Sequence, residues 1–156
     1  MSVYANLKSL NIELPAVATP AAAYVPFVQT GKLVFISGNI ARKDGAAWVG
    51  QLGKNISLDE GKLAARNCAI GLMAALHAAC VANGADLSSV KRIVKVMSLV
   101  NSTPDFTDQH LVTNGCSELI GQVFGPVVGA HARSAFGVAQ IPVGACVEIE
   151  MIAELD

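Results

Sequence analysis

The sequence predicts one α+β domain, a sandwich in which two helices cover one face of a mixed β-sheet. A length of 156 residues corresponds to a single domain. Short segments rich in valine, isoleucine and aromatic residues are interrupted by two longer stretches with helical periodicity. Strands occur in pairs at both ends rather than alternating with helices, which favours an α+β sandwich. The predicted order is β-β-β-α-β-α-β-β, within one domain that spans residues 1–156.

The first part of the chain is expected to contain three strands after a loosely ordered lead-in at residues 1–20. Residues 24–29 and 32–37 carry the β-branched and aromatic side chains that are typical of strands. The glycine-rich segment 41–56 is expected to hold a short third strand near Trp48.

The first helix has a clear start and a clear stop. Ser57 and Glu60 form a capping box, in which the serine caps the helix and the glutamate reaches back to it. Small and apolar residues then recur at helical spacing, and Asn83-Gly84 is a typical C-terminal stop. The many small side chains on the apolar face predict close packing on the sheet.

The second part of the chain is predicted to add a strand, a helix and two closing strands. The strand covers residues 90–100, and the helical region extends from residue 104 to about 124. The closing strands, 131–140 and 145–153, are expected to pair as a hairpin. Alternation in the last strand predicts one apolar face and one face that carries glutamates.

Composition excludes several classes of function. The net charge is −1 and charged residues make up 15% of the chain, which argues against nucleic acid binding. The four cysteines and three histidines do not have metal-ligand spacing, and no nucleotide-binding motif is present, so neither a metal nor a cofactor is expected.

The apolar fraction of 53% is high for a chain with no expected membrane role. We expect no membrane-spanning segment, because the most apolar stretch is interrupted by polar and charged residues, and no signal peptide. The sequence therefore predicts a soluble cytoplasmic protein with reduced cysteines, part of whose apolar surface is buried between subunits.

Two charged residues in the closing strands are the main candidates for chemistry. Arg133 lies among small and apolar residues, where burying a guanidinium without a hydrogen-bonding partner costs free energy. The planar guanidinium can bind a carboxylate through two parallel hydrogen bonds. The partner is either a substrate or, across the predicted hairpin, Glu148 or Glu150. The two glutamates share one face of the last strand, so repulsion between their negative charges would raise the pKa of one of them. Glu148 could then hold or deprotonate a water molecule.

Four further residues are candidates for lining a site. Ser37-Gly38 ends a predicted buried strand, where glycine permits the close approach of a ligand or another backbone. Asn114 could direct an amide into a pocket, and the hydroxyl of Tyr24 could lie near a substrate. Each also has a purely structural interpretation. In it, Ser37-Gly38 only ends a strand, Asn114 belongs to an irregularity in a helix, and the Tyr24 ring packs in the core.

These motifs resemble the Rid family, also called YjgF/YER057c/UK114, over roughly residues 20–154. The family signature is an Ala-Arg-Ser sequence, then Leu-Pro, then a closing Glu-Ile-Glu. The corresponding residues here are Ala132-Arg133-Ser134, Ile141-Pro142 and Glu148-Ile149-Glu150. Further matches are Tyr24, Ile36-Ser37-Gly38 and Asp105-Phe106. Asn114-Gly115 and His131-Ala132-Arg133-Ser134 make the chain similar to a longer subgroup of this family.

The resemblance implies a chorismate-mutase-like sandwich that assembles as a homotrimer, with sites in clefts between subunits. Its better characterised members hydrolyse reactive enamines and imines to 2-oxo acids and ammonia without a metal or cofactor. By this resemblance, Arg133 would hold the carboxylate of a small substrate and Glu148 would activate the attacking water. The substrate cleft would be lined by Tyr24, Ser37, Gly38, Asn114 and Ala135.

The chain departs from the family pattern in two places. Ala135 stands where the family often has cysteine, which removes a thiol from the cleft, and segment 109–130 is several residues longer than in the compact deaminases. Three functions therefore remain open. They are an enamine/imine deaminase, a non-catalytic binder of small carboxylate metabolites in the same cleft, and an endoribonuclease or translation inhibitor, a label that the family often carries.

Overall fold

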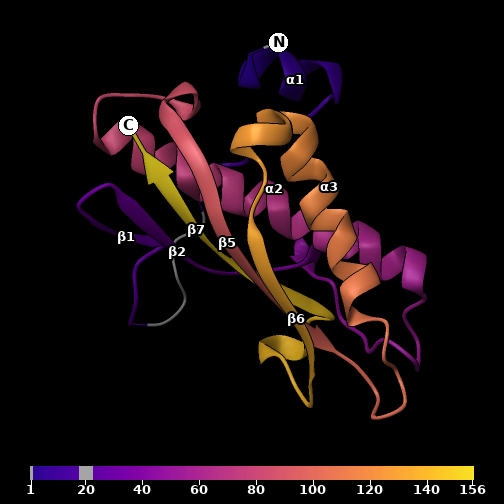
Figure 1. The fold of residues 1–156 in the computed structure, drawn as a ribbon. Coiled ribbons are helices and arrows are strands. Elements are labelled where there is room, and N and C mark those ends of the chain that lie inside the picture. Colours follow the sequence, from indigo (N-terminus) through magenta and orange to yellow (C-terminus); the bar gives the residue numbers. More distant parts are fainter. Residues whose placement is uncertain (1, 18–22) are drawn as a thin grey trace.

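A computed structural model describes residues 2–17 and 23–156, and it is built around one five-stranded sheet (Figure 1). The strand order is β1-β2-β7-β5-β6. Neighbouring strands are antiparallel except β5 and β6, which are parallel, so the sheet is mixed. The strands are β1 (Phe27–Thr30), β2 (Leu33–Ile40), β5 (Val90–Asn101), β6 (Ala132–Val138) and β7 (Val147–Leu155).

Two long helices, α2 (Leu58–Ala82) and α3 (Gln109–Val128), cover one face of this sheet (Figure 1). The core lies between the sheet and the helices. In β7 the alternating residues from Val147 to Ala153 are buried on the helix side, as their period of two predicts. The predicted α+β sandwich with two helices on one face of a mixed sheet is confirmed.

The helix α2 begins and ends where the sequence predicts. The Ser57 side chain accepts from the Glu60 N–H, the Glu60 carboxylate accepts from the Ser57 N–H, and Asn83 is the C-cap. Its small residues permit close packing against α3. At the closest approach, a Cβ placed on Gly115 would overlap the backbone carbonyl of Lys62.

The sequence argument that α2 is not apolar enough to span a membrane is wrong. By length and composition alone this helix passes that test, because its apolar residues outweigh the few polar and charged ones among them. However, 61% of that window is buried inside the protein. The apolar face of α2 is therefore used in the core, as in the central helix of a soluble protein.

The expected loosely ordered lead-in, residues 1–20, contains a helix, α1 (Val3–Ser9). The Ser2 hydroxyl caps it by accepting from the Ala5 N–H, and Leu7 is buried in the core. The Asn6 amide also donates to the Val123 carbonyl at 2.9 Å, which ties α1 to α3. Tertiary contacts thus order a segment too short to form a stable helix alone, while residues 18–20 lie outside the described part.

The short third strand expected near Trp48 is instead a small hairpin of β3 (Arg42–Lys43) and β4 (Ala46–Ala47), which forms a separate two-stranded sheet. A 3-10 helix, η1 (Leu87–Ser89), connects α2 to β5. The backbone of Trp48 follows β4 and accepts a hydrogen bond from the N–H of Cys146.

The predicted hairpin of the two closing strands is also wrong, because β5 lies between β6 and β7. The segment β5-α3-β6 is a crossover that places β6 parallel to β5 at the sheet edge. The chain then turns through the 3-10 helix η2 (Pro142–Gly144), with positive φ at Val143 and Gly144, and enters β7 on the other side of β5. This topology separates residues that are close in the sequence motif.

Candidate functional site

The predicted site residues lie in two groups on opposite faces of the sheet. Side chains of paired residues in neighbouring strands point to the same face. Arg133 pairs with Val96, which is buried under the helices, whereas Glu148 pairs with Leu99 on the uncovered face. The Arg133 group comprises Arg133, Asn114 and Ala135, and the Glu148 group comprises Glu148, Gly38, Ser37 and Tyr24.

The register also shows that the two groups are far apart within one chain. Leu99 pairs with both Glu148 and Phe136, so Glu148 is two strands away from β6. That is about 10 Å across the sheet, and the three residues from Phe136 to Arg133 add about 10 Å along the strand. An ion pair of Arg133 with Glu148 or Glu150 is therefore absent among the described residues, and that structural interpretation of Arg133 is wrong.

A bulge in β2 brings the Glu148 group together. The register with β7 shifts between Ile36 and Asn39, so Ser37 and Gly38 leave the regular ladder. The Glu148 carboxylate lies directly against Gly38, where a Cβ would overlap its Oε1 atom. The predicted close approach at Gly38 is therefore real, and the group that approaches it is the Glu148 side chain.

The segment before β1 is fixed to this bulge. The Ser37 hydroxyl donates to the Val25 carbonyl at 2.6 Å, and its N–H donates to the Pro26 carbonyl at 2.9 Å. Tyr24, the residue immediately before Val25, is 54% exposed. In this chain the Ser37 side chain holds a loop, and the Tyr24 ring is available to a ligand or to another subunit.

Burial and a neighbouring charge both affect the protonation of Glu148. The partial burial of its carboxyl raises the pKa of Glu148, and the like charge of Glu150 raises that pKa further. The predicted repulsion between the two glutamates therefore contributes, but desolvation is the larger cause. A raised pKa makes the ionised carboxylate a stronger base towards a nearby water.

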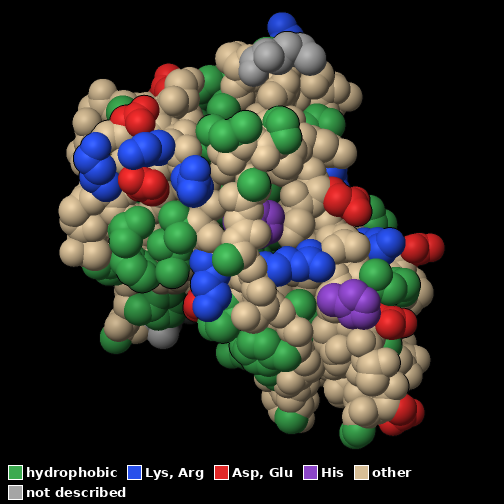
Figure 2. Space-filling view, in the orientation of Figure 1, with side chains coloured by type: hydrophobic (Ala, Val, Ile, Leu, Met, Phe, Trp, Pro, Cys, Tyr) green, Lys and Arg blue, Asp and Glu red, His purple; other side chains and the backbone are tan. Residues whose placement is uncertain are grey.

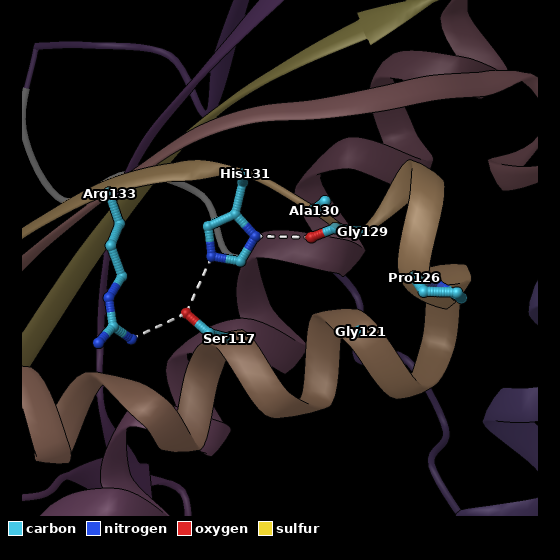
Figure 3. A pocket seen from close by; sticks show the side chains of 8 residues that line it. Ser117, Gly121, Pro126, Gly129, Ala130, His131 and Arg133 are labelled. Atoms are coloured by element: carbon cyan, nitrogen blue, oxygen red, sulfur yellow. Dashed lines mark hydrogen bonds between the residues drawn. The ribbon is translucent and has the colours of Figure 1, made fainter.

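The Arg133 group is organised by one face of α3. His110, Asn114 and Ser117 recur at a spacing of three or four residues, so they share this face. Arg133 donates to the Ser117 hydroxyl at 3.2 Å (Figure 3). It also donates to the His110 carbonyl at 3.0 Å. The contacts hold the guanidinium between β6 and α3 without using a carboxylate.

A histidine that the sequence presented only as part of a motif completes this network. His131 Nε2 lies 2.9 Å from the Ser117 hydroxyl, and His131 Nδ1 lies 2.7 Å from the Gly129 carbonyl (Figure 3). Arg133 and His131 are two apart at the start of β6, and Ser117 is one turn beyond Asn114. Those two spacings are the sequence signals by which Ser117 and His131 could have been found.

A cavity of about 370 Å³ lies beside these three side chains. Arg133, His131 and Ser117 form its polar side (Figure 3). Its other lining residues are small or ring-shaped: Gly121, Gly125, Pro126, Gly129 and Ala130. The break in α3 at Gly125, which has a φ of 81°, shapes this end. Asn114 and Ala135 are half-buried on the same elements but do not line the cavity.

The cysteines are not arranged for nucleophilic chemistry. All four are buried, and burial raises the pKa of Cys116 to about 12 and that of Cys146 to about 11. Burial also raises the pKa of Cys68 and Cys80, which lie in the hydrophobic core. Within residues 2–17 and 23–156, no three His, Cys, Asp or Glu side chains lie close enough to hold a metal ion.

Comparison with known proteins identifies the relatives of this chain. The family model described as Endoribonuclease L-PSP matches residues 15–155. Protein TCP17 of Trypanosoma cruzi is 47% identical over 155 residues, which cover 99% of this chain and 94% of that protein.

Solved structures agree with the sequence match. Atu1372 of Agrobacterium tumefaciens, a protein of unknown function, is 39% identical with a TM-score of 0.87, over 99% of this chain and 94% of that chain. A candidate endoribonuclease of Shewanella oneidensis is 26% identical with a TM-score of 0.92, over 99% and 100% of the two chains. The Escherichia coli YjgF gene product, 24% identical with a TM-score of 0.57 over 90% and 98%, shares the fold. The chain therefore belongs to the Endoribonuclease L-PSP family, the YjgF/UK114 family that its Arg133 and Glu148 motifs predicted.

Proposed function

We propose that this protein is a hydrolytic deaminase that converts reactive enamines and imines to 2-oxo acids and ammonia. The observation that carries the proposal is the guanidinium of Arg133, held in place beside a cavity by neutral groups only. Among the described residues, Ser117 and His110 accept from two of its five N–H groups, which leaves three for the carboxylate of a small substrate.

The chemistry requires little more than orientation and one base. The Glu148 carboxylate takes a proton from water as the oxygen adds to the electrophilic imine carbon. The nitrogen then takes up a proton, and the added hydroxyl group loses its own proton as the carbonyl forms. The carbon–nitrogen bond breaks in this step, so that ammonia leaves and the 2-oxo acid remains. Fixing the substrate carboxylate and the water near each other can contribute up to ~7–11 kcal/mol. No metal or cofactor is needed for these steps.

The two groups can act on one substrate only if they come from different chains, and we propose that the protein is a homotrimer with the site between subunits. The uncovered sheet face supports this assembly. It exposes large apolar side chains that would be buried by a second copy. They are Val28, Leu33, Phe35 and Phe136. Figure 2 shows hydrophobic side chains gathered over β1 and β2 on this face. We place this trimer in the cytoplasm.

A non-catalytic binder of small carboxylate metabolites is the second candidate. Ala135 favours it, because this residue lies on the helix side of β6 two positions after Arg133 and supplies no thiol. Endoribonuclease activity, the description that the family model and the Shewanella relative carry, receives less support. The net charge of −1 gives no surplus of basic residues to hold the phosphates of RNA.

The decisive assay is release of 2-oxo acid from freshly generated imines, with an amino-acid oxidase or a threonine dehydratase as the source. Wild type and Arg133→Ala are compared at equal concentration. Acceleration by wild type that is lost in Arg133→Ala supports the deaminase. No acceleration with several imines, together with Arg133-dependent binding of 2-oxo acids, supports the binder.

A further inference from the structure

When the His131 ring is neutral, the hydrogen bonds around Ser117 have one consistent direction. The Gly129 carbonyl can only accept, so the proton of a neutral His131 ring is on Nδ1 and Nε2 is an acceptor. Arg133 can only donate, so the Ser117 oxygen accepts from it. The hydrogen of the Ser117 hydroxyl is therefore directed to His131 Nε2 at 2.9 Å.

This is the arrangement of an activated nucleophile: a hydroxyl, a base within hydrogen-bond distance and a third group that orients the base. Here the orienting group is a backbone carbonyl at 2.7 Å. The guanidinium at 3.2 Å adds a positive charge beside the same oxygen, which favours the negative charge that develops there. Ser117, His131 and Arg133 all line the cavity of about 370 Å³ (Figure 3).

We propose that Ser117 is a nucleophile, with His131 as its general base, and that the cavity is a site for small acyl esters. The Ser117 oxygen forms a bond to the acyl carbon while its proton passes to His131 Nε2. The bond between that carbon and the alcohol oxygen then breaks, and the alcohol leaves with the proton. Water removes the acyl group by the same route, which releases a carboxylic acid and restores the serine.

The cavity also indicates which substrates fit. The free N–H groups of Arg133 can stabilise the negative charge on the acyl oxygen, as donors in an oxyanion hole do. The small wall residues and the volume of about 370 Å³ leave room for a short acyl chain. This activity goes beyond the proposed deamination, because it uses Ser117 and His131 and does not require Glu148.

The test is covalent labelling with a fluorophosphonate, followed by intact mass measurement and peptide mapping. Wild type should gain one adduct, located on Ser117, and Ser117→Ala should gain none. His131→Gln should react at least ~100-fold more slowly, which is the lower range for loss of a general base. Ser134→Ala is the matched control, because Ser134 is an exposed serine on the opposite face of β6 and its loss should change nothing.

A second measurement keeps the proposal open to refutation if Ser117→Ala fails to fold. In Ser117→Cys the introduced thiol should react rapidly with iodoacetamide, whereas the four native cysteines are buried. Adding His131→Gln should slow that reaction. The proposal is overturned if wild type gains no adduct on Ser117, or if His131→Gln leaves both reaction rates unchanged. Glu148→Gln separates the two proposals, because it should lose release of 2-oxo acid and still be labelled on Ser117.

Discussion

The Arg133 group and the Glu148 group differ in how the chain supports them. Arg133 lies on the edge strand β6, and its contacts are hydrogen bonds to neutral groups of α3. Glu148 lies on the inner strand β7, and it is defined by close contact with Gly38 and by its partial burial. The first group is fixed within one chain, while the second faces an uncovered sheet surface. In the proposed homotrimer, each chain would supply one of these groups to each of two sites.

The largest expected effect comes from removing the guanidinium. In Arg133→Ala, we expect kcat/KM for 2-oxo acid release to fall at least ~100-fold, because a bidentate charge-assisted contact to the substrate is lost. Arg133→Lys keeps the positive charge but loses the planar guanidinium that can form two parallel hydrogen bonds to a carboxylate, so its activity should be intermediate. Equal activity of all three proteins would remove Arg133 from the mechanism.

Gly38→Ala tests the Glu148 group. The added Cβ would overlap the Glu148 carboxylate, which must then move. We expect a ~10–100-fold loss of kcat/KM, since a displacement of about 1 Å in a catalytic group can cost that much. An unchanged rate in Gly38→Ala would show that the position of Glu148 is unimportant.

Gly115→Ala tests the support of the Arg133 group rather than its chemistry. A Cβ at Gly115 would collide with the Lys62 backbone, so α2 and α3 must separate. We expect the free energy of unfolding to fall by ~1–3 kcal/mol, as in other overpacked cores. Gly121→Ala in the same helix should instead raise it by ~0.5–1 kcal/mol. Denaturant unfolding of both variants measures this difference, and equal values would contradict the packing described.

The smallest expected effect concerns pH. Activity requires ionised Glu148, so the rate should fall as the pH decreases through the raised pKa of this residue. Glu150→Gln removes the charge of Glu150, the smaller of the two causes of the raised Glu148 pKa. This should lower the pKa of Glu148 slightly and move the acidic side of the pH–rate profile to lower pH. A pH–rate profile of kcat/KM measures the change. A shift to higher pH would show that Glu150 acts in another way.

Local signals in the sequence predicted much of the fold. The capping box at Ser57 and the stop at Asn83 involve neighbouring residues, and the alternation in β7 depends only on which face is buried. These features need no knowledge of distant contacts. The same is true of Gly38, where glycine indicated a close approach before its partner was known.

The errors that affect the candidate site concern contacts between distant segments. A hairpin of β6 and β7 is compatible with the sequence, and only the crossover through α3 shows that β5 separates them. For the same reason the sequence could not exclude an ion pair between Arg133 and Glu148. It also could not reveal the contact of Ser117 with His131, because that contact depends on how α3 packs against β6.

The most direct test of a shared site is complementation between two inactive variants. Arg133→Ala and Glu148→Gln are purified separately, mixed, and allowed to exchange subunits, with native mass spectrometry to show that mixed oligomers form. Random mixing should produce intact sites at about a quarter of positions, because each site would take its arginine and its glutamate from different chains. We predict that 2-oxo acid release reappears in the mixture while the double variant mixed with either single variant stays inactive. Mixed oligomers without recovered activity would contradict the account.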